Sequence, residues 1–255
     1  MPAQIAIFKA RSDNFGYLVH DRETGRTAAI DAPEERAVLD ALTAHGWTLS
    51  DILITHHHGD HTEALGPLKA RFGARVVGPR GEADRIEGLD ELVSGGDRVS
   101  VGSVAFDVID VPGHTLGHVA YHAPAERALF SGDALFSLGV GRMFEGTPGP
   151  MWDGLKRLRA LDPQTAVYCG HEYTLANAKF ALSVDPSNES LIARAEEAKS
   201  QIESGLPTVP SRLGDEIAAN PFLRADTVAL AGRMGLDGAD PAEVFGALRK
   251  AKDQF

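Results

Sequence analysis

Short runs of apolar and β-branched residues alternate with helical patterns from residue 4 to about residue 170. Strands are expected at residues 14–20, 27–31, 51–55, 74–77, 103–111, 118–122, 127–130 and 165–169. Helical spacing of apolar residues occupies about residues 34–45, and a further helix is expected from about Thr62 to Phe72. Few helical patterns separate the middle strands. We therefore predict an α+β fold built as an αββα sandwich.

The pattern changes after His171. Helix-favouring runs at residues 175–182, 189–204 and 241–252 replace the strands, and β-branched clusters become scarce. Prolines at positions 186, 207, 210 and 221 separate these runs. The sequence thus predicts two domains, one of residues 1–172 and a smaller all-helical one of residues 173–255.

Composition narrows the possible functions. The chain has 255 residues, of which 43% are hydrophobic, and a formal net charge of -11 from 25 Lys and Arg against 36 Asp and Glu. Phosphate backbones require a basic surface, so a nucleic-acid partner is not expected. The sequence shows no signal peptide and no run of eighteen apolar residues, which argues against a membrane partner. The single cysteine, Cys169, is compatible with a reducing compartment, and we expect a cytoplasmic monomer.

The strongest chemical signal is a histidine cluster. Four of the ten histidines fall within residues 56–61, directly after the strand expected at residues 51–55. Alternate residues of an extended chain point the same way, so His56 and His58 can grip one metal ion while the residue between them points elsewhere. Asp60 and His61 follow a bend and can face a second ion. This segment predicts the beginning of a two-metal site.

Two metal sites need more ligands than one segment supplies. Candidates are His114, Asp133 and His171, each of which follows a strand and is preceded by Gly. Taken singly, each is more simply explained as a cap or a hydrogen-bonded polar residue. The set as a whole indicates metal chemistry.

Other polar residues admit simpler interpretations. Asp31 either orients a ligand histidine or forms a turn before Pro33, and the sequence favours neither. Cys169 is expected to be an ordinary buried thiol. The other histidines are interpreted as structural residues of a strand, His118 and His122, or as surface residues, His20 and His45.

The pattern His-x-His-x-Asp-His, followed by isolated His, Asp and His, resembles the metallo-β-lactamase superfamily over residues 1 to about 172. Within that superfamily the chain is similar to the hydroxyacylglutathione hydrolases, or glyoxalase II enzymes, through its last residue. The motifs that carry this similarity lie at residues 13–19, 141–147, 170–174, 177, 185–188, 220–224 and 249–255.

The resemblance implies a complete ligand set. One metal would be bound by His56, His58 and His114, the other by Asp60, His61 and His171, with Asp133 bridging both. The resemblance implies two divalent metal ions per chain. Zn²⁺ is the first candidate, and iron or manganese is possible at one of the two sites. A hydroxide on this binuclear site would be the nucleophile, and Asp60 and Asp133 would be the catalytic side chains that offset the metal charge.

The resemblance also implies a substrate. This is an S-(2-hydroxyacyl)glutathione thioester, chiefly S-D-lactoylglutathione, hydrolysed to D-lactate and glutathione in methylglyoxal detoxification. A thiol leaves readily as thiolate, so no general acid is expected. The family pattern assigns substrate binding to Arg142, Phe144, Tyr173, Arg249 and Lys252.

Two of these positions depart from the family, which often has Lys and Tyr where this chain has Arg142 and Phe144. Arg142 keeps a cation, whereas Phe144 lacks a hydroxyl. Arg249 and Lys252 would share a helical face, although basic residues at the C-terminal end of a helix also complement its dipole.

Five other functions compete with this prediction. A β-lactamase or a lactonase would replace or lose parts of the glutathione-binding set, especially the segment from Arg249 to Lys252, and a glutathione persulfide dioxygenase would use one iron. An RNA-processing nuclease is disfavoured by the acidic charge. A zinc-stabilised binding module would close its sites with four protein ligands each.

Overall fold

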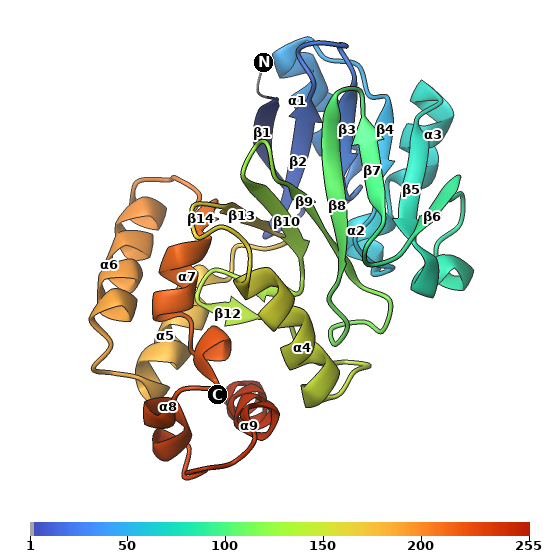
Figure 1. The fold of residues 1–255 in the computed structure, drawn as a ribbon. Coiled ribbons are helices and arrows are strands. Elements are labelled where there is room, and N and C mark those ends of the chain that lie inside the picture. The colour runs from blue at the N-terminus through green and yellow to red at the C-terminus, as the bar shows by residue number, and fades with distance from the viewer. Residues whose placement is uncertain (1–2) are drawn as a thin grey trace. The chain divides into compact units, whose positions relative to one another are not determined.

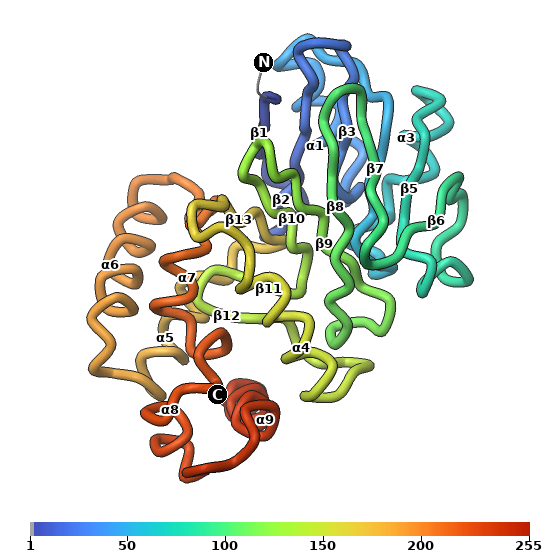
Figure 2. The backbone as a smooth tube through the Cα atoms, viewed as in Figure 1, coloured from blue at the N-terminus to red at the C-terminus, as the bar shows by residue number. Residues whose placement is uncertain are grey.

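Residues 3–255 are described by a computed structural model, in which the chain passes three times between two structural units. The first unit contains residues 3–110 together with Leu116–Gly132, and the second contains Val111–Thr115 together with Asp133–Phe255. The path of the backbone is drawn in Figure 2. Because Val111–Thr115 interrupts the first unit, neither unit is a single continuous piece of chain.

The first unit begins with a six-stranded sheet in the order β1-β2-β3-β4-β5-β6. Its strands are β1 (Gln4–Ala10), β2 (Asn14–His20), β3 (Thr27–Ile30), β4 (Asp51–Leu53), β5 (Arg75–Pro79) and β6 (Glu91–Val93). The first three strands pair antiparallel, and β3 to β6 pair parallel. Helices α1 (Glu35–His45) and α3 (Leu65–Phe72) cover one face (Figure 1), where Val38 and Leu68 join the same apolar core as Leu18 and Ile52.

The other face of this sheet packs against a second group of strands. These are β7 (Arg98–Val101), β8 (Val104–Asp110), β9 (Val119–Ala123) and β10 (Ala128–Gly132), which pair antiparallel. Between the sheets the rings of Tyr17 and Phe130 have centroids 5.6 Å apart, and the Tyr121 hydroxyl donates to the Ile54 carbonyl at 2.9 Å. The unit also contains α2 (Gly59–Thr62) and the 3₁₀ helix η1 (Arg80–Arg85).

The second unit is mainly helical. Its elements are β11 (Leu135–Phe136), β12 (Gly139–Val140), α4 (Pro148–Arg159), β13 (Ala166–Cys169), α5 (Thr174–Val184), α6 (Glu189–Glu203), β14 (Ser211–Arg212), α7 (Leu213–Ala219), η2 (Pro221–Arg224), α8 (Val228–Arg233) and α9 (Pro241–Asp253). Asn188 and Asp240 cap α6 and α9 by accepting hydrogen bonds from backbone N–H groups of the first turn. Ala181 of α5, Leu191 of α6 and Ala219 of α7 share an apolar core.

Most of the expected strands and helices are present, but α4, a helix of 12 residues, and the strands β1, β6 and β7 were not among them. The helix expected from Thr62 to Phe72 is two helices, because the Ala64 N–H leaves the helical path to donate to the Ala32 carbonyl at 2.9 Å. The two-residue strand β14 lies in a region that was expected to be entirely helical. Within residues 3–255, no helix is both long enough and apolar enough to cross a lipid bilayer.

Candidate metal centre

The first candidate ligands lie where the chain leaves β4 and enters α2. The His56 Nε2 and His58 Nδ1 atoms are 3.2 Å apart, and His56 is fully buried. His57 faces another way, with its Nδ1 2.7 Å from a carboxylate oxygen of Glu82. The alternation expected from extended backbone is therefore present, and it pairs two imidazole nitrogens as a shared ion would require.

Asp60 and His61 follow within α2. The His61 Nε2 lies 3.6 Å from Asp60 Oδ2, and the same Asp60 oxygen accepts a hydrogen bond from the Asn14 amide at 3.0 Å. On the other side of the His61 ring, Nδ1 lies 2.8 Å from Asp31 Oδ2. Asp31 therefore makes the hydrogen bond to a candidate ligand histidine that the orienting interpretation requires. Asp31 also receives hydrogen bonds from the backbone N–H and hydroxyl of Thr55, at 2.7 and 2.9 Å.

The second unit brings together the other three candidates. Asp133 Oδ2 lies 3.4 Å from His114 Nε2 and 3.4 Å from His171 Nε2, and all three side chains are buried. One carboxylate oxygen between two imidazole nitrogens has the arrangement that a bridging ligand needs. His114 Nδ1 lies 2.9 Å from the backbone carbonyl of Arg142.

Glycine is required immediately before Asp133. Gly132 has a φ of +49°, and a Cβ at this position would lie 2.7 Å from the Thr55 hydroxyl and 2.8 Å from the His118 ring. Both neighbours are in the first unit, so a side chain here would disturb the loop that carries His56. The Gly that precedes Asp133 in the sequence therefore has a steric reason.

The hydrogen bonds of three histidine rings suit metal ligation. Nδ1 lies against the Thr55 hydroxyl in His56 at 3.0 Å, against Asp31 in His61 and against the Arg142 carbonyl in His114. An acceptor at Nδ1 fixes the tautomer with its lone pair on Nε2, which is the pattern of metal-binding histidines. In the first unit His56, His58, Asp60 and His61 offer donor atoms of the kind that bind metal ions, and in the second unit His114, Asp133 and His171 do the same. The donor set therefore fits a metal site.

Three of the predicted substrate residues are exposed. The Tyr173 ring stacks on that of His171 with centroids 4.7 Å apart, and 37% of Tyr173 is exposed. Phe144 is 59% exposed, and its ring centroid lies 5.3 Å from that of His114. The exposed Arg142 places its Nε 3.8 Å from Asp253 Oδ1. Aromatic surface thus borders two of the candidate ligands.

The two basic residues of α9 are not equivalent. Arg249 is 3% exposed, and its Nη1 and Nη2 donate to the Val140 carbonyl at 2.8 Å and to Asp253 at 3.0 Å. Lys252 is half-buried, with Nζ 5.5 Å from the centroid of the Phe180 ring. Burial lowers the pKa of Lys252 from 10.5 to about 8. The Arg249 side chain is consequently part of the buried interior of the second unit, whereas Lys252 is more accessible to solvent.

Cys169 is a buried thiol, as expected. It is 1% exposed, its Sγ donates to the His171 carbonyl at 3.4 Å, and burial raises its pKa to about 12. Among the other histidines, His118 and His122 are buried. His45 is exposed, and His20 is half-buried with its ring stacked on Trp47 at a centroid distance of 4.5 Å.

Sequence reasoning missed the buried carboxylate of Glu82. Glu82 accepts hydrogen bonds from the backbone N–H of His57 at 2.5 Å and of Gly117 at 3.1 Å, besides its contact with the His57 ring. A glutamate in a charged segment, Arg80–Arg85, gives no sequence signal for such a role.

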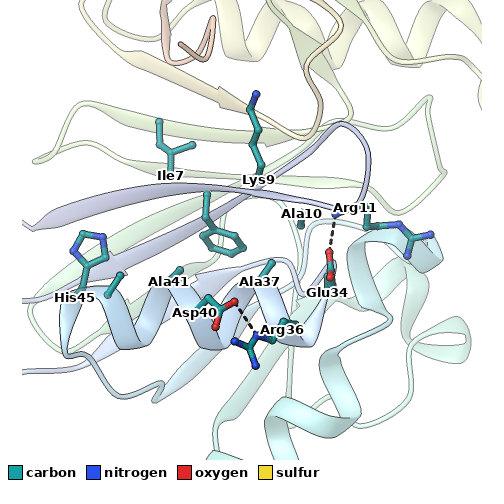
Figure 3. A pocket seen from close by; sticks show the side chains of 12 residues that line it. Ile7, Lys9, Ala10, Arg11, Glu34, Arg36, Ala37, Asp40, Ala41 and His45 are labelled. Atoms are coloured by element: carbon teal, nitrogen blue, oxygen red, sulfur yellow. Dashed lines mark hydrogen bonds and ion pairs between the residues drawn. The ribbon is translucent and has the colours of Figure 1, made fainter. Parts of the chain in front are cut away.

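A cavity of about 460 Å³ beside β1 and α1 contains none of the predicted site residues. Figure 3 shows two contacts among the residues that line it, from the Arg36 side chain to Asp40 at 2.8 Å and from the backbone N–H of Arg11 to Glu34 at 2.8 Å. It is therefore not part of the candidate metal centre.

Comparisons with known proteins identify relatives of this chain. A family model described as the metallo-beta-lactamase superfamily matches residues 23–171, and one described as hydroxyacylglutathione hydrolase C-terminus matches residues 172–255. The hydroxyacylglutathione hydrolase of Rhizobium meliloti (strain 1021) is 51% identical over 252 residues, covering 99% of this chain and 98% of that protein.

Solved structures add evidence for the fold. BLEG-1 B3 metallo-beta-lactamase is 20% identical with a TM-score of 0.67, covering 86% of this chain and 99% of that chain. TTHA1623 in a di-iron-bound form is 29% identical with a TM-score of 0.57, covering 64% of this chain and 90% of that chain.

Proposed function

Because this chain belongs to the hydroxyacylglutathione hydrolase family of the metallo-β-lactamase superfamily, we propose that it hydrolyses S-(2-hydroxyacyl)glutathione thioesters, chiefly S-D-lactoylglutathione. The observation that carries the proposal is 51% identity to a relative of that name over nearly the full length of both chains. The fold is the αββα sandwich of the superfamily with a helical C-terminal region. The products would be D-lactate and glutathione.

We propose that two divalent metal ions bind per chain, with Zn²⁺ as the first candidate. One site would consist of His56, His58 and His114, the other of Asp60, His61 and His171, with Asp133 as the bridge. The role proposed for Asp133 is supported within the second unit, where its Oδ2 lies 3.4 Å from Nε2 of His114 and 3.4 Å from Nε2 of His171. Carboxylate ligands also suit iron or manganese at one site, and the related TTHA1623 is described as di-iron-bound.

The donor set suits thioester hydrolysis. Divalent ions held there would lower the pKa of a bound water to about 7 and polarise the thioester carbonyl as Lewis acids. Asp60 and Asp133 offset the positive charge at the centre. Hydrolysis forms a C–O bond to water and breaks the C–S bond, and glutathione departs as thiolate because thiol pKa values lie near 8.5. A general acid from the protein is not required.

We propose that the helical segment 173–255 binds glutathione. Lys252 and the exposed Arg142 supply cations for the carboxylates of the tripeptide, and Tyr173 and Phe144 supply aromatic surface. The buried Arg249 would contribute chiefly by holding α9 against the Val140 carbonyl. We further propose a cytoplasmic monomer, for which the single buried thiol of Cys169 is compatible with a reducing compartment.

The test is steady-state hydrolysis of S-D-lactoylglutathione by purified protein, with metal content determined on the same sample. The expected result is rapid turnover with about two metals per chain, as in two-metal hydrolases. His58→Ala should abolish turnover, and His45→Ala, a change at an exposed histidine, should leave it unchanged. No turnover by fully metallated wild-type protein would overturn the proposal.

A further inference from the structure

The carboxylate of Glu82 is an unexpected feature of the first unit. Glu82 is 2% exposed, and it lies in η1, which supplies none of the candidate ligands. Removing a carboxylate from water is costly unless hydrogen bonds replace its hydration. The hydrogen-bond partners of the Glu82 carboxylate therefore indicate what this buried side chain does.

The partners of Glu82 come from two other segments. Oε2 accepts from the backbone N–H of His57 at 2.5 Å and lies 2.7 Å from Nδ1 of the same residue. Oε1 accepts from the Gly117 N–H at 3.1 Å. One carboxylate therefore holds both the main chain and the ring of His57 and ties them to Gly117.

The hydrogen bonds from Glu82 to His57 also restrict the orientation of the two neighbouring residues, His56 and His58. The N–H of His57 belongs to the peptide that joins it to His56, so its hydrogen bond sets the plane of that peptide. Because alternate side chains of extended backbone point in opposite directions, a fixed His57 ring directs both of its neighbours to the other side. There the nitrogens of His56 and His58 approach to 3.2 Å.

Through Gly117, Glu82 also restricts the position of the residue that packs on the other side of the His56 ring. The two segments are so close that a Cβ on Gly117 would lie 2.4 Å from the side-chain Cγ of Glu82 and 2.7 Å from the backbone C of Gly81. The following residue, His118, stacks its ring on that of His56, with centroids 4.6 Å apart and planes 17° apart. The next amide, that of Val119, donates to the Thr55 carbonyl at 3.0 Å. The His56 ring is thus held from two directions through one carboxylate.

We propose that Glu82 is a positioning residue for the metal ligands His56 and His58. It holds their two nitrogens at the separation that one ion needs before the ion arrives. This inference rests on the proposed metal-dependent function. It predicts that loss of the Glu82 hydrogen bonds weakens metal retention and lowers kcat while the KM for the glutathione thioester changes little.

The test compares Glu82→Gln with Glu87→Gln, a matched change at an exposed glutamate five residues further along. Gln keeps the size of the side chain, but its amide N–H₂ cannot accept hydrogen bonds. Zinc retention is measured by titration with a competing chelator, and the cobalt-loaded proteins are compared by absorption spectroscopy. Glu82→Gln should bind about 10–100-fold more weakly, as expected for residues that orient metal ligands, and should alter the cobalt spectrum.

Several outcomes decide the matter. Zinc retention and a cobalt spectrum equal to those of Glu87→Gln would overturn the role of Glu82 and leave the proposed function standing. Failure of the wild-type protein to bind zinc or hydrolyse the thioester would overturn the proposed function instead. If Glu82→Gln does not fold, His57→Ala removes the ring contact alone. Weaker zinc retention in that variant supports the proposal, and unchanged retention contradicts it.

Discussion

Asp31 and His61 are joined through Oδ2 and Nδ1 at 2.8 Å, and both side chains are buried. The carboxylate also receives the backbone N–H and hydroxyl of Thr55. One aspartate thereby links the end of β3, the loop after β4 and the histidine of α2. The link sets which His61 nitrogen carries the proton, and it leaves Nε2 for a metal.

Replacing Asp31 should separate these two effects. Asp31→Ala should weaken metal binding about 10–100-fold and destabilise the fold by about 1–3 kcal/mol, because the buried Thr55 N–H loses its acceptor. Asp31→Asn keeps an oxygen for Thr55 and tolerates the φ of +59° at this position. It should retain most of the stability and still bind metal weakly. Chelator competition and urea unfolding measure the two quantities, and wild-type metal affinity in Asp31→Asn would contradict the prediction.

Lys252 should make substrate binding depend on pH. Its pKa of about 8 lies below the usual 10.5, so the cation is present at pH 7 and is largely lost at pH 9. The KM for S-D-lactoylglutathione should therefore rise between these pH values. Lys252→Arg should flatten the profile, because a guanidinium stays charged. An equally steep rise in that variant would assign the effect to another group.

The same shift has a consequence for stability. Between pH 8 and 10.5 the unfolded chain still binds the Lys252 proton while the folded chain has released it. Because the unfolded state binds more protons in this window, the Lys252 contribution to the free energy of unfolding rises with pH there. Comparison of urea unfolding of the wild type and Lys252→Arg at pH 8 and pH 10 should show a smaller rise in the variant.

Arg249 should act on stability more than Lys252 does. Arg249→Ala removes a buried hydrogen bond to the Val140 carbonyl and a partly buried one to Asp253, which should cost about 2–3 kcal/mol because the donor is charged. Lys250→Ala, at an exposed position of the same helix, serves as the control. Thermal and urea unfolding measure the loss. A variant as stable as the control, with only a raised KM, would show that Arg249 serves the substrate directly.

Substitution of Phe144 by Tyr should improve substrate binding. Its ring is 59% exposed, its centroid lies 5.3 Å from that of His114, and the sequence resemblance to the family implies that Tyr is common at this position. Phe144→Tyr should restore one hydrogen bond to substrate and lower KM about 2–10-fold, the range expected for a net gain of about 0.5–1.5 kcal/mol. Phe144→Leu should lack this gain. An unchanged KM in the Tyr variant would place the substrate away from this ring.

Local sequence patterns were enough to predict much of the fold and the directions of neighbouring side chains in the histidine cluster. The strand Asn14–His20 and the helix near Glu35–His45 follow directly from apolar spacing over a few residues. The opposite directions of His56 and His57 follow in the same way from extended backbone. The break between α2 and α3 did not, because it depends on the Ala32 carbonyl, which is remote in the sequence. Short helices such as Leu213–Ala219 carry too few periodic positions to be recognised.

The sequence by itself determines which side chains are candidate metal ligands, because imidazole and carboxylate chemistry belongs to the residue type and the spacing of these residues belongs to the local backbone. The sequence does not determine which partners hold those side chains. Asp31 is 30 residues from His61, and Glu82 is 25 residues from His57. Their contacts exist because separate strands end at the same edge and bring their loops together. Sequence periodicity specifies which face a residue occupies, whereas packing of the assembled strands selects the neighbour it meets.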